Sequence, residues 1–482
     1  MAPRLCLAVL LVGTTMLTAP VRADDLRSAL VMAYNTNPAL QAARAQQRGV
    51  DETVPIARAA GLPSLSGSAS YTEFLKKSPN SFAAPDRALD VQASLSIPIY
   101  SGGAVRNSIS AADTRVEAGQ ADLRGTETGV FNQVVAAYMD VIQNQALVGL
   151  NRNNTQVLGV NVQATRDRFE IGDLTRTDVA QSQSRLALAR GNLRTAESNL
   201  IASRERYIQI VGKAPVALQP PPPLPGMPTS PDQAVSVALE ANPDLQAARE
   251  RSKAAGYDVN VAAAGRLPKV TVVIGPDYTD YLGTLGGPGA QAGTFKQSQL
   301  TAQAALRASI PIFQGGLPAA QRRQAQAREG QSLEQEIGVE RAVIAQVRSA
   351  YASWQAASEI INTNQTAVDA ATLSLEGVRA ENSVGNRTIL DILNAEQELL
   401  GAQTQLVGAR RNAYVAGFSL LAAMGRAQAG DLGLDGGPLY DPDVNYRRVR
   451  HKINDWANDP APRPQATRTV DTVVQDGSIP AQ

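Results

Sequence analysis

Few side chains in this sequence could carry out catalysis. It contains one histidine, His451, and one cysteine, Cys6. His451 lies in the basic segment Arg447–Lys452, where a solvated surface is the expected setting. A Ser-His-Asp triad and a His- or Cys-based zinc site both lack parts, and no glycine-rich phosphate-binding loop occurs. The sequence therefore predicts a protein that is not an enzyme, with no catalytic residues and no metal or cofactor site.

Two short segments place a hydroxyl group three residues before a carboxylate: Thr175 with Asp178, and Thr388 with Asp391. This spacing is a helix-start signature, because each side chain can bond the backbone amide of the other residue. Capping is thus the plain interpretation of both aspartates. A glycine precedes each pair at the point where a helix would end with a left-handed residue. These glycines, Gly172 and Gly385, predict the turns of two helical hairpins.

The hairpins belong to a longer unit that occurs twice. The motif Asn37–Arg44 recurs at Asn242–Arg249, and Ile97–Gly103 recurs at Ile310–Gly316. The second copy is longer, and its glycine-rich stretch 282–295 is the expected place of the insertion, since surface loops tolerate extra residues. The duplication predicts a first structural repeat at 24–212, a proline-rich linker at 213–231 and a second repeat at 232–438.

Both ends of the chain lie outside the repeats. Residues 1–23 resemble a secretory signal, with a basic start, a short apolar stretch and a small-residue cleavage site. Removing them takes away Arg4 and Arg22, which lowers the basic residues from 45 to 43 against 44 acidic ones. A net charge of −1 gives no reason to expect nucleic-acid binding. The tail 439–482 matches neither copy and is expected to be partly disordered.

Long helices are predicted in the C-terminal part of each repeat. No proline occurs from Ile99 to Ala214 or from Ala319 to Gly437, and apolar residues recur there at helical spacing. A single helix over Val105–Ile171 would be ~100 Å long at ~1.5 Å per residue, which no globular core needs. The predicted helical regions are 104–212 and 316–426, and a coiled-coil rod is their plain interpretation.

A different pattern precedes each helical region. Apolar and polar residues alternate over 89–99 and again over 300–310, which fits a membrane-spanning strand of ~9–11 residues. Gly275-Pro276 is expected to interrupt the upstream partner of the second strand. The predicted β-hairpins are 64–100 and 269–313. The predicted strand-to-helix turns contain Gly102, Gly103, Gly315 and Gly316.

Four strands from one chain cannot close a barrel, and an open sheet edge is not tolerated in lipid. Transmembrane barrels begin at about eight strands, so a membrane location requires several chains. Two chains would give eight strands, and three would give twelve and leave more room inside. A soluble β-hairpin packed on helices is the alternative that the pattern leaves open.

Three motifs together resemble the TolC family of outer-membrane efflux proteins: the duplicated Asn-Pro-x-Leu start, the Ile-Pro-Ile-(Tyr/Phe)-x-Gly-Gly strand end, and Val384–Leu393. The resemblance covers nearly all of 24–438. It implies a mainly α fold with membrane β structure, in which a homotrimeric twelve-stranded β-barrel continues into a twelve-helix periplasmic α-barrel. It also implies a place in the outer membrane of a Gram-negative cell, contact with outer-membrane lipid, a periplasmic adaptor protein and an inner-membrane ABC or proton-driven pump.

The resemblance also assigns roles near the hairpin turns. It implies that Arg387 reaches Thr177 and Asp178 and holds the periplasmic entrance closed. It places Asp391 in the lumen, where three copies form an acidic ring that attracts cations. This sequence departs from the family at two positions. Asn382 occupies the position of the family's gate tyrosine, and Asn394 occupies that of a second ring aspartate. The constriction then carries fewer charges, and weaker cation selectivity is expected.

Two classes of function remain. The first is a passive exit duct of a tripartite export system. The tail residues Tyr440–Pro442, Asn445-Tyr446 and Val449-Arg450 resemble the type I secretion branch, which favours protein secretion over RND-type multidrug efflux. The second is a non-conducting periplasmic coiled-coil protein. A duct should form a trimer and conduct ions, whereas a rod should be extracted without detergent.

Overall fold

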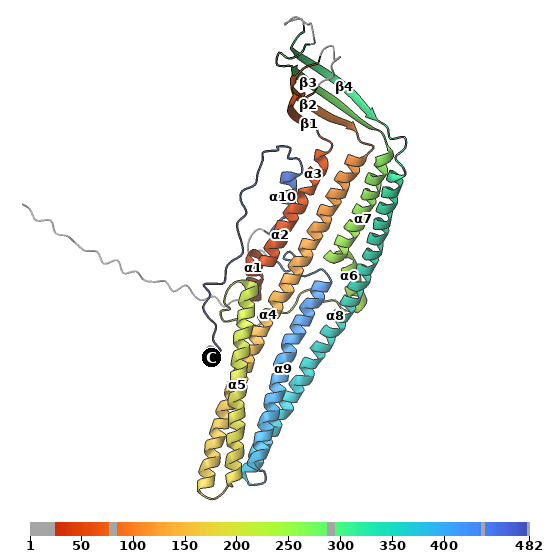
Figure 1. Ribbon diagram of the computed structural model, residues 1–482. Helices are drawn as coiled ribbons and strands as arrows, with labels where there is room; N and C mark the ends of the chain where they lie inside the picture. The colour runs from red at the N-terminus through yellow and green to blue at the C-terminus, as the bar shows by residue number, and fades with distance from the viewer. Residues whose placement is uncertain (1–24, 77–83, 287–294, 435–438, 480–482) are drawn as a thin grey trace, which may run out of the picture.

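The computed structural model describes residues 25–76, 84–286, 295–434 and 439–479. The expected signal at 1–23 and the centre of the glycine-rich stretch, 287–294, lie outside these residues. The protein is strongly elongated. One β-sheet forms one end, and long helices extend from it to the opposite end (Figure 1).

Two helices of 67 residues each set the length of the molecule. They are α4 (Ala104–Glu170) and α8 (Leu317–Ser383), and each is ~100 Å long at ~1.5 Å per residue. At the end far from the sheet, each turns back into an antiparallel partner, α5 (Arg176–Val211) or α9 (Ile389–Ala423). Of the helices in the described part of the chain, none combines sufficient length with sufficient apolar character to traverse a membrane.

Shorter helices accompany the half of α4 and α8 that lies nearer the sheet. α2 (Pro38–Asp51) packs on α4, and α7 (Pro243–Ala263) packs on both α4 and α8. These four helices therefore form a single layer in the order α2, α4, α7, α8 (Figure 1). The remaining helices are α1 (Leu26–Thr36), α3 (Thr53–Ala59), α6 (Pro231–Ala241), α10 (Pro442–Val449) and a 3-10 turn at Ala264–Arg266.

The duplicated Asn-Pro motif closes each repeat on itself. Asn37 and Asn242 cap the helix that follows, and the proline occupies the first helical position, where no amide donor is needed. The side-chain amide of Asn37 donates to the Ile210 carbonyl at 2.9 Å. That of Asn242 donates to the Ala423 carbonyl at the same distance, 2.9 Å. One buried asparagine thus joins the start of each repeat to the end of its last long helix.

The four strands form one antiparallel sheet in the order β1, β2, β3, β4. They are β1 (Ser64–Glu73), β2 (Arg87–Tyr100), β3 (Lys269–Asp280) and β4 (Ser298–Ser309). β3 continues through Gly275-Pro276, where an interruption was expected, but its pairing with β2 lapses at these two residues. Pro276 stays in register opposite Ala302, and Gly275 fits because a Cβ there would lie only 2.0 Å from the Ala93 carbonyl oxygen.

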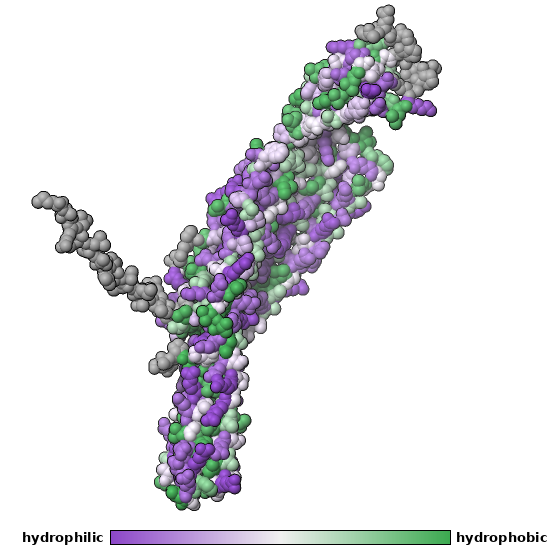
Figure 2. Space-filling view, turned by 60° about the vertical axis from the view of Figure 1, so that its left-hand side comes forward, coloured by the Kyte–Doolittle hydropathy of each residue, from purple (hydrophilic) through white to green (hydrophobic). Residues whose placement is uncertain are grey.

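The two faces of the sheet differ in polarity. One row across the four strands consists of Leu65, Leu95, Ile274 and Ala304, and a row on the other face consists of Ser70, Asp90, Thr279 and Gln299. Leu65 and Leu300, both on the apolar face, are 75% and 71% exposed. Apolar side chains are accordingly visible at the surface of the sheet end in Figure 2. The apolar face is therefore open to its surroundings rather than packed on the helices.

The main hydrophobic core lies midway along the molecule, where α1, α4, α5 and α9 come together. Tyr138, Phe131 and Phe418 are almost fully buried there. Tyrosines also fix the linker 213–231. The hydroxyl groups of Tyr138, Tyr414 and Tyr351 donate to the carbonyls of Gln219, Pro222 and Thr229 at 2.7, 3.1 and 3.2 Å, respectively. Both repeats therefore hold the linker.

The tail contacts the helices at two places. α10 packs on α2, and the side-chain amide of Asn445 donates to the buried Asp51 carboxylate at 2.6 Å. Farther along, Arg204 of α5 donates to the carbonyls of Asp476 and Ser478 at 2.6 and 2.9 Å. The irregular segment after α10 is therefore fixed near its end by a charged side chain.

The buried carboxyl of Asp51 is expected to make the stability of the fold depend on pH. Burial raises the pKa of its carboxyl above the ordinary value, and hydrogen bonds from Asn445 and Gln47 oppose that shift. Because the folded state holds the proton more tightly than the unfolded chain, the contribution to stability is greatest below the ordinary pKa. It is lost as the pH rises through the raised folded-state pKa.

We therefore expect Asp51→Asn to remove this loss, because the neutral amide does not titrate. The melting temperature of the variant, relative to wild type, should rise from about pH 4 to about pH 7. Thermal unfolding of the detergent-solubilised protein measures it. Asp232→Asn, at an exposed position on α6, is the control. Parallel pH profiles for wild type and both variants would show that Asp51 does not make the stability of the fold depend on pH.

Candidate functional site

The two hairpin turns lie at the end of the molecule opposite the sheet (Figure 1). Gly172 and Gly385 follow α4 and α8 with φ angles of +83° and +85°, the left-handed conformation that favours glycine. The next amide, of Asp173 or Asn386, donates back across the turn to a helix carbonyl at 2.9 Å in both cases. The last carbonyls of both long helices are satisfied in this way, and the chain is redirected within a few residues.

Both helices after the turns begin with a capping box. The Asp178 carboxylate accepts from the Thr175 amide at 2.9 Å, and the Thr175 hydroxyl accepts from the Asp178 amide. Thr388 and Asp391 repeat this arrangement, with the amide-to-carboxylate distance again 2.9 Å. The hydrogen bonds from the threonines hold the pKa of each aspartate below its ordinary value. Both carboxylates are therefore ionised at neutral pH and act as helix caps.

Arg387 is engaged within its own hairpin. Its Nε donates to Oε2 of Glu381 at 2.7 Å, and this hydrogen bond raises the pKa of the guanidinium. Asn382 donates from its side chain to the Arg387 carbonyl at 2.6 Å. Among the described residues of this chain, no hydrogen bond or ion pair joins Arg387 to Thr177 or Asp178. The contact that the resemblance implies requires a neighbouring chain or a rearrangement of the hairpins, and it stays a prediction.

A buried carboxylate outside the predicted site joins the two hairpins. Glu396 of α9 is 6% exposed and accepts from Asn161 of α4 and from Arg379 of α8, both at 3.0 Å. Nearby, Arg185 of α5 donates to Asn394 of α9 at 3.0 Å. Side chains from all four long helices therefore meet close to the turns. In the sequence, the sign that could have revealed Glu396 is its place as an acidic residue among the apolar side chains that α9 buries.

Loss of this carboxylate should loosen the hairpins. We expect Glu396→Ala to lower the free energy of unfolding by ~1–3 kcal/mol, because Asn161 then lacks its acceptor in a partly buried setting. Glu398→Ala removes the same charge from an exposed position on the same helix and is the matched control. Limited proteolysis and thermal unfolding measure the effect. If the two variants behave alike, Glu396 does not link the hairpins.

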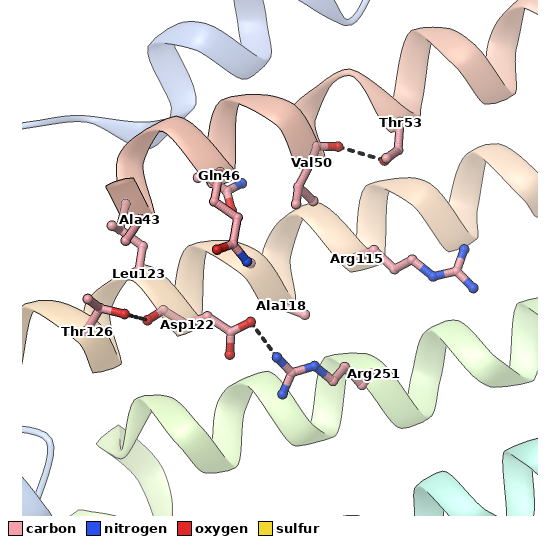
Figure 3. A pocket seen from close by; sticks show the side chains of 12 residues that line it. Ala43, Gln46, Val50, Thr53, Arg115, Ala118, Asp122, Leu123, Thr126 and Arg251 are labelled. Carbon is pink, nitrogen blue, oxygen red and sulfur yellow. Dashed lines mark hydrogen bonds and ion pairs between the residues drawn. The ribbon is translucent and has the colours of Figure 1, made fainter. Parts of the chain in front are cut away.

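A cavity of about 460 Å³ lies between α2, α4 and α7, away from the turns (Figure 3). Charged side chains of α4 and α7 line one of its sides. Arg251 pairs with Asp122, a contact that Figure 3 marks, and Arg115 pairs with Asp258. Because both of these arginines pair with a carboxylate of the facing helix, the cavity is a seam between helices that is held by ion pairs.

The whole arrangement has known relatives. The family described as "Outer membrane efflux protein" matches residues 29–213 and 234–426, which correspond to the two repeats. The outer membrane efflux protein BepC of Brucella suis biovar 1 is 34% identical over 445 residues, which cover 92% of this chain and 94% of BepC. The outer membrane protein TolC of Escherichia coli K12 is 27% identical over 424 residues, which cover 85% of this chain and 84% of TolC.

A solved structure shares the fold. The CmeC outer membrane channel of Campylobacter jejuni aligns with a TM-score of 0.73 at 17% identity, over 89% of this chain and 90% of CmeC. The resemblance to the TolC family, which rested on the duplicated motifs, is confirmed by the family match and by the two relatives. The chain therefore belongs to the outer membrane efflux protein family.

Proposed function

We propose that three copies of this chain form a passive exit duct across the outer membrane and the periplasm. As a member of its family, the chain is an outer-membrane protein that extends into the periplasm. Its family and its structural neighbours are channel proteins rather than enzymes. The duct is the end of a tripartite export system, and it carries cargo without converting energy.

One observation carries the proposal: the sheet has two faces of opposite polarity and two open edges. Within the described residues, β1 and β4 each have a neighbouring strand on one side only. Lipid cannot satisfy the free backbone groups of such edges. Three sheets that pair edge to edge give twelve strands, with the apolar faces towards lipid and the polar faces towards water. Below the sheet, the layer of α2, α4, α7 and α8 then gives a ring of twelve helices.

In this assembly the hairpin turns form the periplasmic entrance. Arg387 leaves its contact with Glu381, binds Thr177 and Asp178 instead, and so closes the entrance. Asp391 contributes to a ring of three carboxylates that favours the passage of cations. Since the sequence contains no phosphate-binding loop, the energy for transport comes from partners. These are a periplasmic adaptor protein and an inner-membrane pump of the ABC or proton-driven type.

Two kinds of cargo are supported by different observations. The tail motif at 440–450 favours type I protein secretion, whereas the likeness to BepC, an efflux protein, favours small-molecule efflux. Deletion of the gene separates them. Loss of exported proteins from the culture medium indicates secretion, and increased sensitivity to antibiotics indicates efflux.

Conductance tests the duct itself. We expect the protein to fractionate with outer membranes, to have the mass of a trimer in detergent and to form discrete channels in planar bilayers. A monomer that leaves the membrane without detergent and conducts no ions would support the coiled-coil rod instead.

A further inference from the structure

The segments that cross the boundary between the sheet and the helices contain basic residues and no acidic ones. The chain crosses it in four segments, 53–72, 91–112, 259–276 and 281–328, and none of them contains an aspartate or a glutamate. Cations in these segments near the boundary are Arg58, Arg106, Arg266, Lys269, Arg307, Arg322 and Arg323. Such a band, basic and free of acids, is complementary to a negatively charged surface.

Two of these cations line a pocket. It has a volume of about 220 Å³ and lies where the chain passes from β4 into α8. Arg266 and Arg322 contribute its charged lining, and Ile312 and Phe313 its apolar lining. Ile312 and Phe313 are 96% and 87% exposed, so two large apolar side chains stand at the surface beside two guanidinium groups.

The two guanidinium groups lack an acidic partner in the described residues, where neither Arg266 nor Arg322 forms an ion pair. Nε of Arg322 is buried there without a hydrogen-bond acceptor. Such a donor is costly unless a ligand or a neighbouring chain supplies the acceptor. In the proposed trimer, the segment that leads into β1 of the next chain lies beside β4, and it belongs to the acid-free range 53–72. The neighbouring chain therefore brings no carboxylate from this segment.

We propose that this pocket binds the phosphate group of an anionic glycerophospholipid at the periplasmic surface of the membrane, one lipid per chain. The inference rests on the proposed duct, because it takes the sheet to span the membrane. Two guanidinium groups are opposite in charge to a lipid phosphate and complementary to it in hydrogen-bond geometry. Ile312 and Phe313 lie where the acyl chains begin, which favours a lipid over a free phosphate ion. The bound lipid fixes the depth of the sheet in the membrane.

Lipid retention by the full-length trimer tests the site. The trimer is reconstituted with phosphatidylglycerol in an excess of phosphatidylcholine, and native mass spectrometry counts the phosphatidylglycerol that it retains. We expect Arg266→Gln/Arg322→Gln to weaken retention about tenfold or more. Arg341→Gln/Arg348→Gln removes the same charge farther down α8 and is the matched control, with retention at the wild-type level.

Two further measurements identify the ligand and separate the two proposals. Phe313→Ser should weaken retention of the lipid, and excess inorganic phosphate should not displace it. Full displacement by inorganic phosphate, or equal retention by wild type and Arg266→Gln/Arg322→Gln, overturns the lipid site. Conductance of the wild-type trimer is recorded separately in planar bilayers. If the wild-type trimer forms channels but retains no phosphatidylglycerol, only the lipid site is refuted. If the protein forms neither trimers nor channels, the proposed duct is refuted.

Discussion

Ala304→Arg will prevent the protein from accumulating in the outer membrane, whereas Gln303→Arg will leave it near the wild-type level. The two residues are adjacent in the middle of β4, but their side chains lie on opposite faces of the sheet. Ala304 belongs to the apolar row with Ile274 and Leu65, and Gln303 lies on the polar face opposite Gly275. An arginine at the midplane of a lipid-facing surface costs ~2–4 kcal/mol, and each copy in the proposed trimer bears that cost. An arginine on the polar face remains hydrated.

Immunoblots of outer-membrane fractions, together with the amount of trimer that survives detergent, measure this difference. Both variants introduce the same side chain and the same charge at adjacent positions, so a difference between them reports the face of the sheet rather than the arginine itself. If both variants accumulate equally, the apolar row does not face lipid, and the proposed duct loses the observation that carries it.

Arg387→Ser will open the periplasmic entrance and raise the single-channel conductance several-fold. In the proposed closed state, each of three arginines holds a neighbouring hairpin through charge-assisted hydrogen bonds, and their joint loss should shift the ratio of closed to open channels by about tenfold or more. Glu381→Ala is the matched control. It breaks the ion pair that Arg387 forms within its own hairpin but leaves the guanidinium available for the closing contact. We therefore expect its entrance to stay closed.

The aspartate side of this contact needs a control for helix capping. Asp178→Ala removes both the acceptor for Arg387 and half of the capping box, whereas Thr175→Ala damages the capping box alone. We expect Asp178→Ala to conduct more than wild type and Thr175→Ala to conduct like wild type in planar bilayers. Equal leakage from both variants would assign the effect to the helix start. Unchanged conductance in both Arg387→Ser and Asp178→Ala would refute the closing contact.

Features that depend on neighbouring residues were predictable from the sequence. Alternation of apolar and polar side chains marked the strands, and a glycine followed by Thr-x-x-Asp marked each hairpin turn, because both patterns reflect local geometry. The pairing of β2 with β3 was not predictable, since the helices below determine how the two repeats lie side by side. The continuity of β3 through Pro276 also depends on neighbours, because its pairing with β4 is maintained there.

The candidate site was predictable only in part, for the same reason. Thr175 and Asp178 cap each other over three residues, so their geometry follows from spacing. Glu396 meets Asn161 across a separation of 235 residues, and this contact depends on the rotational phase of two long helices. The docking of Asp476 on Arg204 joins residues 272 apart. A polar, proline-bearing composition conceals such docking, because only a few scattered apolar side chains of the tail, such as Tyr446 and Ile479, pack on the helices beside these hydrogen bonds.

The buried asparagines also bear on ancestry. Because Asn37 and Asn242 tie the beginning of each repeat to its end, each half of the chain is a closed unit whose termini already meet. A half-length progenitor with one such unit could have built the proposed ring from six copies. Gene duplication then allowed the halves to diverge, as at Glu396, whose counterpart in the first half is Gln183. In the proposed trimer, the backbone arrangement would therefore repeat six times around the axis, whereas the side-chain chemistry repeats only three times.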